Sequence, residues 1–97
     1  MADLIASDQL ESVLQSQAPG WELGDASISR VFSFDNYMAG IEFVNEVAKL
    51  AEEANHHPDI VIGWRKVTLE LSTHSAGGLT GLDFQLAGKI TPLVDGA

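Results

Sequence analysis

The stretch 52-EEANHHPDIVIGWRKVTLELSTHSAGGLTGLD-83 decides the fold, because it contains the end of one helix and two strands. Asn55 can close a helix in the left-handed conformation, and Pro58 prevents the helix from continuing. Residues 59–64 and 67–73 are then predicted to be two strands. The second strand alternates apolar and polar side chains, which is typical of a strand with one buried face.

The last part of this stretch predicts the start of another helix. Gly77-Gly78 interrupts the chain, and Thr80 is followed three residues later by Asp83. This is the spacing of a capping box, in which both side chains bond backbone N–H groups at a helix start. We expect the new helix to pack its apolar side chains: Leu82, Leu86, Ile90 and Leu93.

The residues before this stretch predict a first helix and two more strands. Asp8 and Glu11 have capping-box spacing, and apolar residues at helical spacing then continue to Ala18. Residues 21–23 and 27–34 are predicted to be strands.

A long helix is predicted to connect the two pairs of strands, with Asp35 as its N-cap and its end near Ala54. The resulting order α-β-β-α-β-β-α predicts a single α+β domain over residues 1–97. Its simplest packing is a four-stranded antiparallel sheet with three helices packed on one face. The apolar side chains of the long helix predict its buried stripe: Tyr37, Ile41, Val44, Val47, Ala48 and Ala51.

The composition excludes several classes of function. The 97 residues include 5 Lys and Arg against 14 Asp and Glu, so the net charge is −9. Because nucleic acids and anionic lipids are bound through clustered basic residues, we expect no direct contact with either. There is no cysteine, which leaves no disulfide framework and no thiolate site. We find no secretory signal and no 18-residue apolar stretch, and we therefore expect a cytoplasmic protein.

All three histidines lie within residues 52–83, as the adjacent pair His56-His57 and as His74 after the second strand. Histidine has an ordinary pKa of about 6.5, so it gives and takes protons near neutrality. Glu52 lies one helical turn before His56 and is spaced to orient its imidazole. Asp83 can support the site if its helix start faces the histidines. Structural explanations compete with these: helix capping and solvation for the histidines, and a solvated helix face for Glu52.

Other kinds of site fit the pattern less well. Three histidines and a carboxylate can bind zinc, but an adjacent pair is awkward for one metal, and no HxH or HxxxH pair is present. The chain has no Gly-x-Ser-x-Gly nucleophile motif and no glycine-rich phosphate loop. We therefore expect no metal at this site.

The order and spacing of these residues resemble a known family. Glu52, the run His56-His57-Pro58, Trp64, His74 and Asp83 are similar to the signature of the pterin-4a-carbinolamine dehydratases. The resemblance implies an α+β fold and a hydro-lyase that converts 4a-hydroxytetrahydropterin to quinonoid dihydropterin in tetrahydrobiopterin recycling. It also implies no cofactor, because the pterin nitrogen supplies the electrons that expel the hydroxyl.

The resemblance also implies roles for the individual residues. His56 and His74 are expected to be the acid–base pair, both at the surface of a pocket, and His57 is expected to bind and polarise the substrate. Glu52 and Asp83 would orient the histidines.

A further group of residues is expected to contact the pterin. Of the two tryptophans, Trp21 is the candidate for a pocket wall, whereas Trp64, within a predicted strand, is expected in the core. The expected contacts are the residues that flank the histidines, together with this pocket wall: Asn55, Pro58, Ser72, Thr73, Ser75 and Trp21.

A second class of function stays open under the resemblance. The family is also known for a dimerisation cofactor of a homeodomain transcription factor. Related chains that lack the histidine set serve as assembly factors for carbon-fixing enzymes, and a different pterin substrate is a further alternative. The full histidine set of this chain favours the enzyme. Unpaired sheet edges and the resemblance both predict a homodimer or homotetramer.

Overall fold

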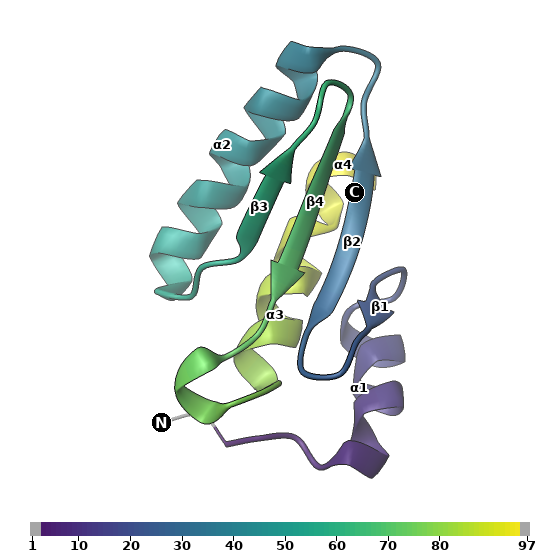
Figure 1. Cartoon of the computed structure of the whole chain (residues 1–97), viewed down its shortest axis with the longest axis vertical. Helices are drawn as coiled ribbons and strands as arrows, with labels where there is room; N and C mark the ends of the chain where they lie inside the picture. Colours follow the sequence, from purple (N-terminus) through teal and green to yellow (C-terminus); the bar gives the residue numbers. More distant parts are fainter. Residues whose placement is uncertain (1–2, 96–97) are drawn as a thin grey trace.

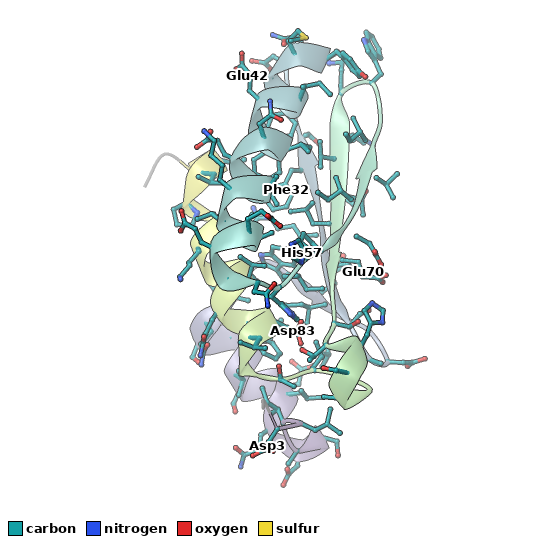
Figure 2. All side chains as sticks on the ribbon, turned by 90° about the vertical axis from the view of Figure 1, so that its left-hand side faces the viewer. Asp3, Phe32, Glu42, His57, Glu70 and Asp83 are labelled. Atoms are coloured by element: carbon teal, nitrogen blue, oxygen red, sulfur yellow. The ribbon has the colours of Figure 1, made fainter. Side chains whose placement is uncertain are left out.

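The computed structural model describes residues 3–95 and confirms the α+β architecture (Figure 1). Four strands form one antiparallel sheet in the order β1-β2-β4-β3. The helices lie on one side of this sheet, which leaves its other face open in the part of the chain described (Figure 2). The strands are β1 (Glu22–Leu23), β2 (Ile28–Ser33), β3 (Asp59–Ile62) and β4 (Lys66–Leu71).

Three helices of at least two turns follow the predicted order, and three single-turn helices were not predicted. The main helices are α1 (Leu10–Gln17), α2 (Tyr37–Ala54) and α3 (Gly81–Ile90). The short ones are the 3₁₀ helices η1 (Ser7–Gln9) and η2 (His74–Ala76), and α4 (Pro92–Asp95). Among the described residues, none of the helices has the length and apolar composition that a membrane crossing requires.

The inner strand β4 carries the centre of the core. It pairs along its whole length with β2 on one side, and its residues 67–70 pair with β3 on the other side. Its alternation is confirmed, because Val67, Leu69 and Leu71 are buried under the helices. β4 ends at Leu71, two residues earlier than predicted. The core side chains that α3 adds differ in part from the prediction, since Leu82 and Leu93 are exposed and the buried ones are Phe84, Leu86, Ala87 and Ile90.

Two of the predicted helix caps are wrong. Asp8 lies inside η1, and α1 begins after it with no side-chain cap. The N-cap of α2 is Asn36, whose Oδ1 accepts a hydrogen bond from the Ala39 N–H at 2.9 Å, and not Asp35. Phe34 still bonds across to the β4 side of the sheet, because its N–H donates to the Arg65 carbonyl at 2.9 Å. The extended chain therefore continues past β2 and delays the helix start.

The buried stripe of α2 is rotated relative to the prediction. Val47 and Ala51 are buried as expected, but Tyr37 and Ala48 are exposed. Phe43 is buried instead, and its ring lies 4.7 Å from the Phe32 ring and 5.2 Å from the Phe34 ring, measured between centroids. Burying the Phe43 ring against two other aromatic rings removes a large apolar area from water. This gain in free energy favours the observed rotation of the helix, which exposes Tyr37 and Ala48.

The two tryptophans exchange their predicted environments. Trp21 is only 3% exposed, packs edge-on against Phe32 and donates its indole N–H to Thr91 Oγ1 at 3.0 Å. It is a core residue and not the pocket wall that we predicted. Trp64 is 74% exposed, because β3 ends at Ile62 and leaves Trp64 in the turn between β3 and β4.

Candidate active site

Three segments meet at one end of the sheet: the turn after α2, the segment after β4 and the start of α3 (Figure 1). They bring His56, His74 and Asp83 to the same end of the molecule. Hydrogen bonds of His56, Thr73 and Thr80 with Asp83 join the three segments.

Asn55 separates the two adjacent histidines from the helix before them. Its backbone is left-handed (φ 50°, ψ 43°), as predicted, and it ends α2. The His56 N–H then donates to the Ala51 carbonyl at 3.1 Å. After this reversal the two imidazoles diverge, so that His56 is 9% exposed whereas the His57 side chain is 54% exposed. His56 is therefore a buried residue and not the surface residue that we predicted.

Asp83 is the centre of a buried polar network. Its carboxylate is fully buried and faces three donors, which come from three different segments of the chain. His56 Nε2 lies 2.6 Å from Oδ1, while Oδ2 accepts from Thr73 Oγ1 at 2.8 Å and from the Thr80 N–H at 2.9 Å. The contact with Thr80 completes the predicted capping box. Asp83 thus caps α3 and orients His56 at the same time.

The second nitrogen of His56 remains available to a ligand. Every buried side-chain nitrogen and oxygen among the described residues has a hydrogen-bond partner. Within this part of the chain, the contact with Asp83 engages Nε2, and no side-chain hydrogen bond involves Nδ1. Nδ1 is therefore not completely enclosed, although the His56 side chain is only 10% exposed. The imidazole is held on one side by Asp83, and its other nitrogen has no side-chain partner among the described residues.

Glu52 pairs with a different histidine from the one predicted. Its Oε2 lies 2.6 Å from His57 Nε2, and both side chains are exposed. The spacing rule for helix neighbours assumes that the helix continues, but the left-handed Asn55 takes His56 off that path. In this structure the exposed pair directs Nε2 of His57 toward Glu52.

The segment after β4 presents His74 to solvent and turns Thr73 inward. His74 begins η2 and is exposed, as is Ser75. Thr73 is buried, and its hydroxyl contacts Asp83 and Thr80 Oγ1. Because this hydroxyl is buried and gives its hydrogen to Asp83, the structure does not support the predicted pterin contact for this side chain. The other predicted contacts stay accessible at least in part: Asn55, Pro58 and Ser72.

Thr80 also belongs to the buried network. The sequence predicted this residue only as a helix cap. Its hydroxyl is fully buried and lies 2.8 Å from Thr73 Oγ1. The signal was present in the capping box itself, since the N-cap residue at this helix start had to lie beside Asp83.

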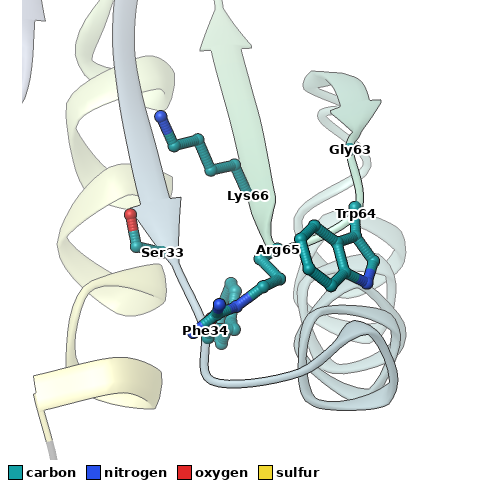
Figure 3. Close-up of a pocket in the computed structure, with 6 residues that line it drawn as sticks. All are labelled: Ser33, Phe34, Gly63, Trp64, Arg65 and Lys66. Carbon is teal, nitrogen blue, oxygen red and sulfur yellow. The ribbon is translucent and has the colours of Figure 1, made fainter.

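Two open cavities lie elsewhere, toward the other end of the sheet. One of about 470 Å³ lies beside the β3–β4 turn, where Arg65 bonds the Phe34 carbonyl and lies against Trp64 (Figure 3). The other, of about 390 Å³, lies between the end of β2, α2 and α4. Neither includes a histidine, so the polar network and not the cavity volume identifies the candidate site.

Comparisons with known proteins show which family this chain is similar to. The family model for pterin 4 alpha carbinolamine dehydratase matches residues 3–93. A protein of Roseiflexus castenholzii, provisionally named pterin-4-alpha-carbinolamine dehydratase, is 48% identical over 94 residues, covering 97% of this chain and 100% of that protein. A Picosynechococcus protein with the same provisional name is 46% identical over 93 residues, covering 96% of this chain and 100% of that protein.

Solved structures share the fold. A transcriptional coactivator/pterin dehydratase from Brucella melitensis superposes with a TM-score of 0.87 at 28% identity, over 94% of this chain and 98% of that chain. A pterin dehydratase-like protein described as a RuBisCO assembly factor in the alpha-carboxysome superposes with a TM-score of 0.64 at 25% identity, over 76% of this chain and 88% of that chain. With a family model that matches almost its whole length and relatives nearly half identical, the chain belongs to the pterin 4 alpha carbinolamine dehydratase family.

Proposed function

We propose that this protein dehydrates a 4a-hydroxytetrahydropterin to the quinonoid dihydropterin by histidine acid–base catalysis. The observation that carries the proposal is the His56–Asp83 pair, in which the carboxylate orients the imidazole through Nε2 and leaves Nδ1 without a side-chain partner among the described residues. The family membership and the names of the relatives support the substrate class.

The reaction requires two proton transfers. The bond between C4a and the hydroxyl oxygen breaks, and a general acid protonates the oxygen so that it leaves as water. A general base removes the proton from N5, whose electron pair forms the new double bond to C4a. General acid–base groups in place contribute about 10²–10⁴-fold to such steps.

His56 and His74 are the groups that we assign to these two transfers, and His57 binds and polarises the pterin. His56 is oriented by Asp83, and His74 lies one residue after Thr73, which bonds the same carboxylate. His57 is held by Glu52 at the exposed side of the site. We propose Asn55, Pro58, Ser72 and Ser75 as the residues that contact the ring.

The test of the proposed function is a direct assay. Purified protein should accelerate the dehydration of synthetic 4a-carbinolamine, and treatment with EDTA should leave the rate unchanged, since the proposed chemistry uses only protein side chains. The absorbance change of quinonoid dihydropterin formation measures the rate. A rate equal to the uncatalysed one would refute the proposed function, and inhibition by EDTA that zinc reverses would refute a mechanism without metal.

We also propose that the chain forms a homodimer or homotetramer. β3 pairs on one side only, and β1 covers only the first two residues of β2, so residues 31–33 lack a strand partner on that side within the described chain. Open strand edges of this kind favour pairing with another copy.

Assembly should depend on salt, because each chain carries a net charge of −9. Repulsion between like subunits is screened over about 8 Å at physiological salt. We expect sedimentation at low micromolar concentration in 0.15 M salt to show an oligomer that tightens as salt rises. A single monomeric species under these conditions would refute the assembly and leave the catalytic proposal intact.

A further inference from the structure

Two buried threonine hydroxyls lie behind Asp83 and take no part in the chemistry proposed above. Thr73 Oγ1 and Thr80 Oγ1 are 2.8 Å apart, and Thr73 Oγ1 is also 2.8 Å from Asp83 Oδ2. Both residues are buried, so neither hydroxyl serves to bind solvent or substrate. Their role must lie within the network.

With Asp83 as an ionised carboxylate, the direction of each hydrogen bond in this network follows. A hydroxyl group has only one hydrogen to donate. Thr73 donates its hydrogen to Asp83 Oδ2, so the hydrogen between the two threonines must come from Thr80. Thr80 Oγ1 in turn accepts from the Leu82 N–H at 3.2 Å. The donors therefore all point from the start of α3 toward the carboxylate.

This arrangement makes Asp83 an acceptor toward His56. Oδ2 already accepts two hydrogen bonds, from Thr73 and from the Thr80 backbone, and such contacts stabilise an ionised carboxylate. The remaining oxygen, Oδ1, lies 2.6 Å from His56 Nε2. An ionised carboxylate has no hydrogen to give, so Nε2 must carry the hydrogen in that contact.

We propose that Thr73 and Thr80 are positioning residues, which hold Asp83 as an acceptor and so fix His56 in the tautomer with hydrogen on Nε2. In both charge states of the ring Nε2 then keeps its hydrogen, and only Nδ1 exchanges a proton with a ligand. The tautomer assignment rests on the hydrogen-bond geometry around an ionised Asp83, whereas its effect on turnover rests on the proposed dehydratase function.

The wild-type protein provides the first test, which requires no turnover. Protonated and unprotonated imidazole nitrogens have well-separated ¹⁵N chemical shifts, so a long-range ¹H–¹⁵N spectrum of labelled protein reports the tautomer. The spectrum is recorded at a pH where the ring is neutral. We expect hydrogen on Nε2 of His56 and none on Nδ1. Hydrogen on Nδ1 would overturn the proposal, whether or not the protein is a dehydratase.

A matched pair of variants tests the threonines. Thr73→Val keeps the shape of the side chain but removes the hydroxyl, whereas Thr73→Ser keeps the hydroxyl. We expect Thr73→Val to give a mixture of His56 tautomers and to lower kcat about 10-fold or more, with little change in KM, because the hydroxyl does not reach the ligand. Thr73→Ser should restore both the single tautomer and kcat.

Thr80→Val and Thr80→Ser repeat the comparison one hydrogen bond further from Asp83, where we expect the same effects to be smaller. A single Nε2–H tautomer and an unchanged kcat in both valine variants would show that the threonines do not position His56. If the wild-type protein has no dehydratase activity, the proposed function fails, and the tautomers of wild type and variants still decide this proposal.

Discussion

Replacing His74 by alanine should lower kcat about 10²–10⁴-fold, the usual contribution of a general acid or base, while the fold remains intact. The side chain is exposed and forms no side-chain hydrogen bond within residues 3–95. Substitutions at such positions change the free energy of unfolding by about 0.5 kcal/mol or less. The assay is the rate of carbinolamine dehydration at saturating substrate, compared with thermal unfolding of the same preparation.

His74→Gln separates proton transfer from simple contact with the pterin. Glutamine can donate and accept hydrogen bonds but cannot transfer a proton near neutral pH. If His74 is an acid or base, the glutamine variant should be about as inactive as the alanine variant. Recovery of most of the wild-type kcat in His74→Gln would assign His74 to binding and remove it from the acid–base pair.

The local sequence signals predicted the centre of the fold well. The alternation in β4, the left-handed Asn55 and the capping box of Thr80 and Asp83 all occur as expected. Each depends on residues within a few positions of one another, and the backbone physics of one turn or strand is enough to determine it. The cap of α2 was misplaced because Asp35 and Asn36 are both good caps, and only the pairing beyond β2 selects between them.

The environments of the two tryptophans are determined by contacts with residues that are distant in the sequence. Trp21 finds a hydrogen-bond partner in Thr91, seventy positions away, which fits it into the core. Trp64 is exposed because the β3 strand is two residues shorter than its apolar pattern suggests. Element ends are set by the packing of the whole sheet, so a strand pattern alone could not place either ring.

The sequence grouped the histidines with Glu52 and Asp83, but it did not predict which acid contacts which histidine. Glu52 was assigned to His56 by helix spacing, but the chain reversal at Asn55 gives it to His57. His56 is instead turned inward onto Asp83. The burial of His56 has a further consequence, since its removal would leave one oxygen of a buried carboxylate without a donor. A variant at His56 is therefore a weaker test of chemistry than one at His74.

Asp83→Ala should reduce the free energy of unfolding by about 3–5 kcal/mol, because each buried donor that loses its acceptor costs about 1–3 kcal/mol. The fully buried carboxylate faces His56, Thr73 and the Thr80 N–H, and alanine leaves all three without an acceptor. A domain of this size is stable by only about 5–15 kcal/mol, so the loss is a large share of the total. Urea unfolding at a fixed protein concentration measures it, because self-association would otherwise shift the midpoint.

The size of the effect decides between two roles for Asp83. If it were only a helix cap, its removal would cost about 1 kcal/mol, as capping residues usually do. Glu53→Ala is the matched control, because it removes the same charge from an exposed position near the end of α2 and should change the free energy by about 0.5 kcal/mol or less. A loss near 1 kcal/mol in Asp83→Ala would show that Asp83 stabilises the fold only as a helix cap. A loss of about 3 kcal/mol or more, with Glu53→Ala unchanged, would support Asp83 as the residue that joins α3, the segment after β4 and His56 into one site.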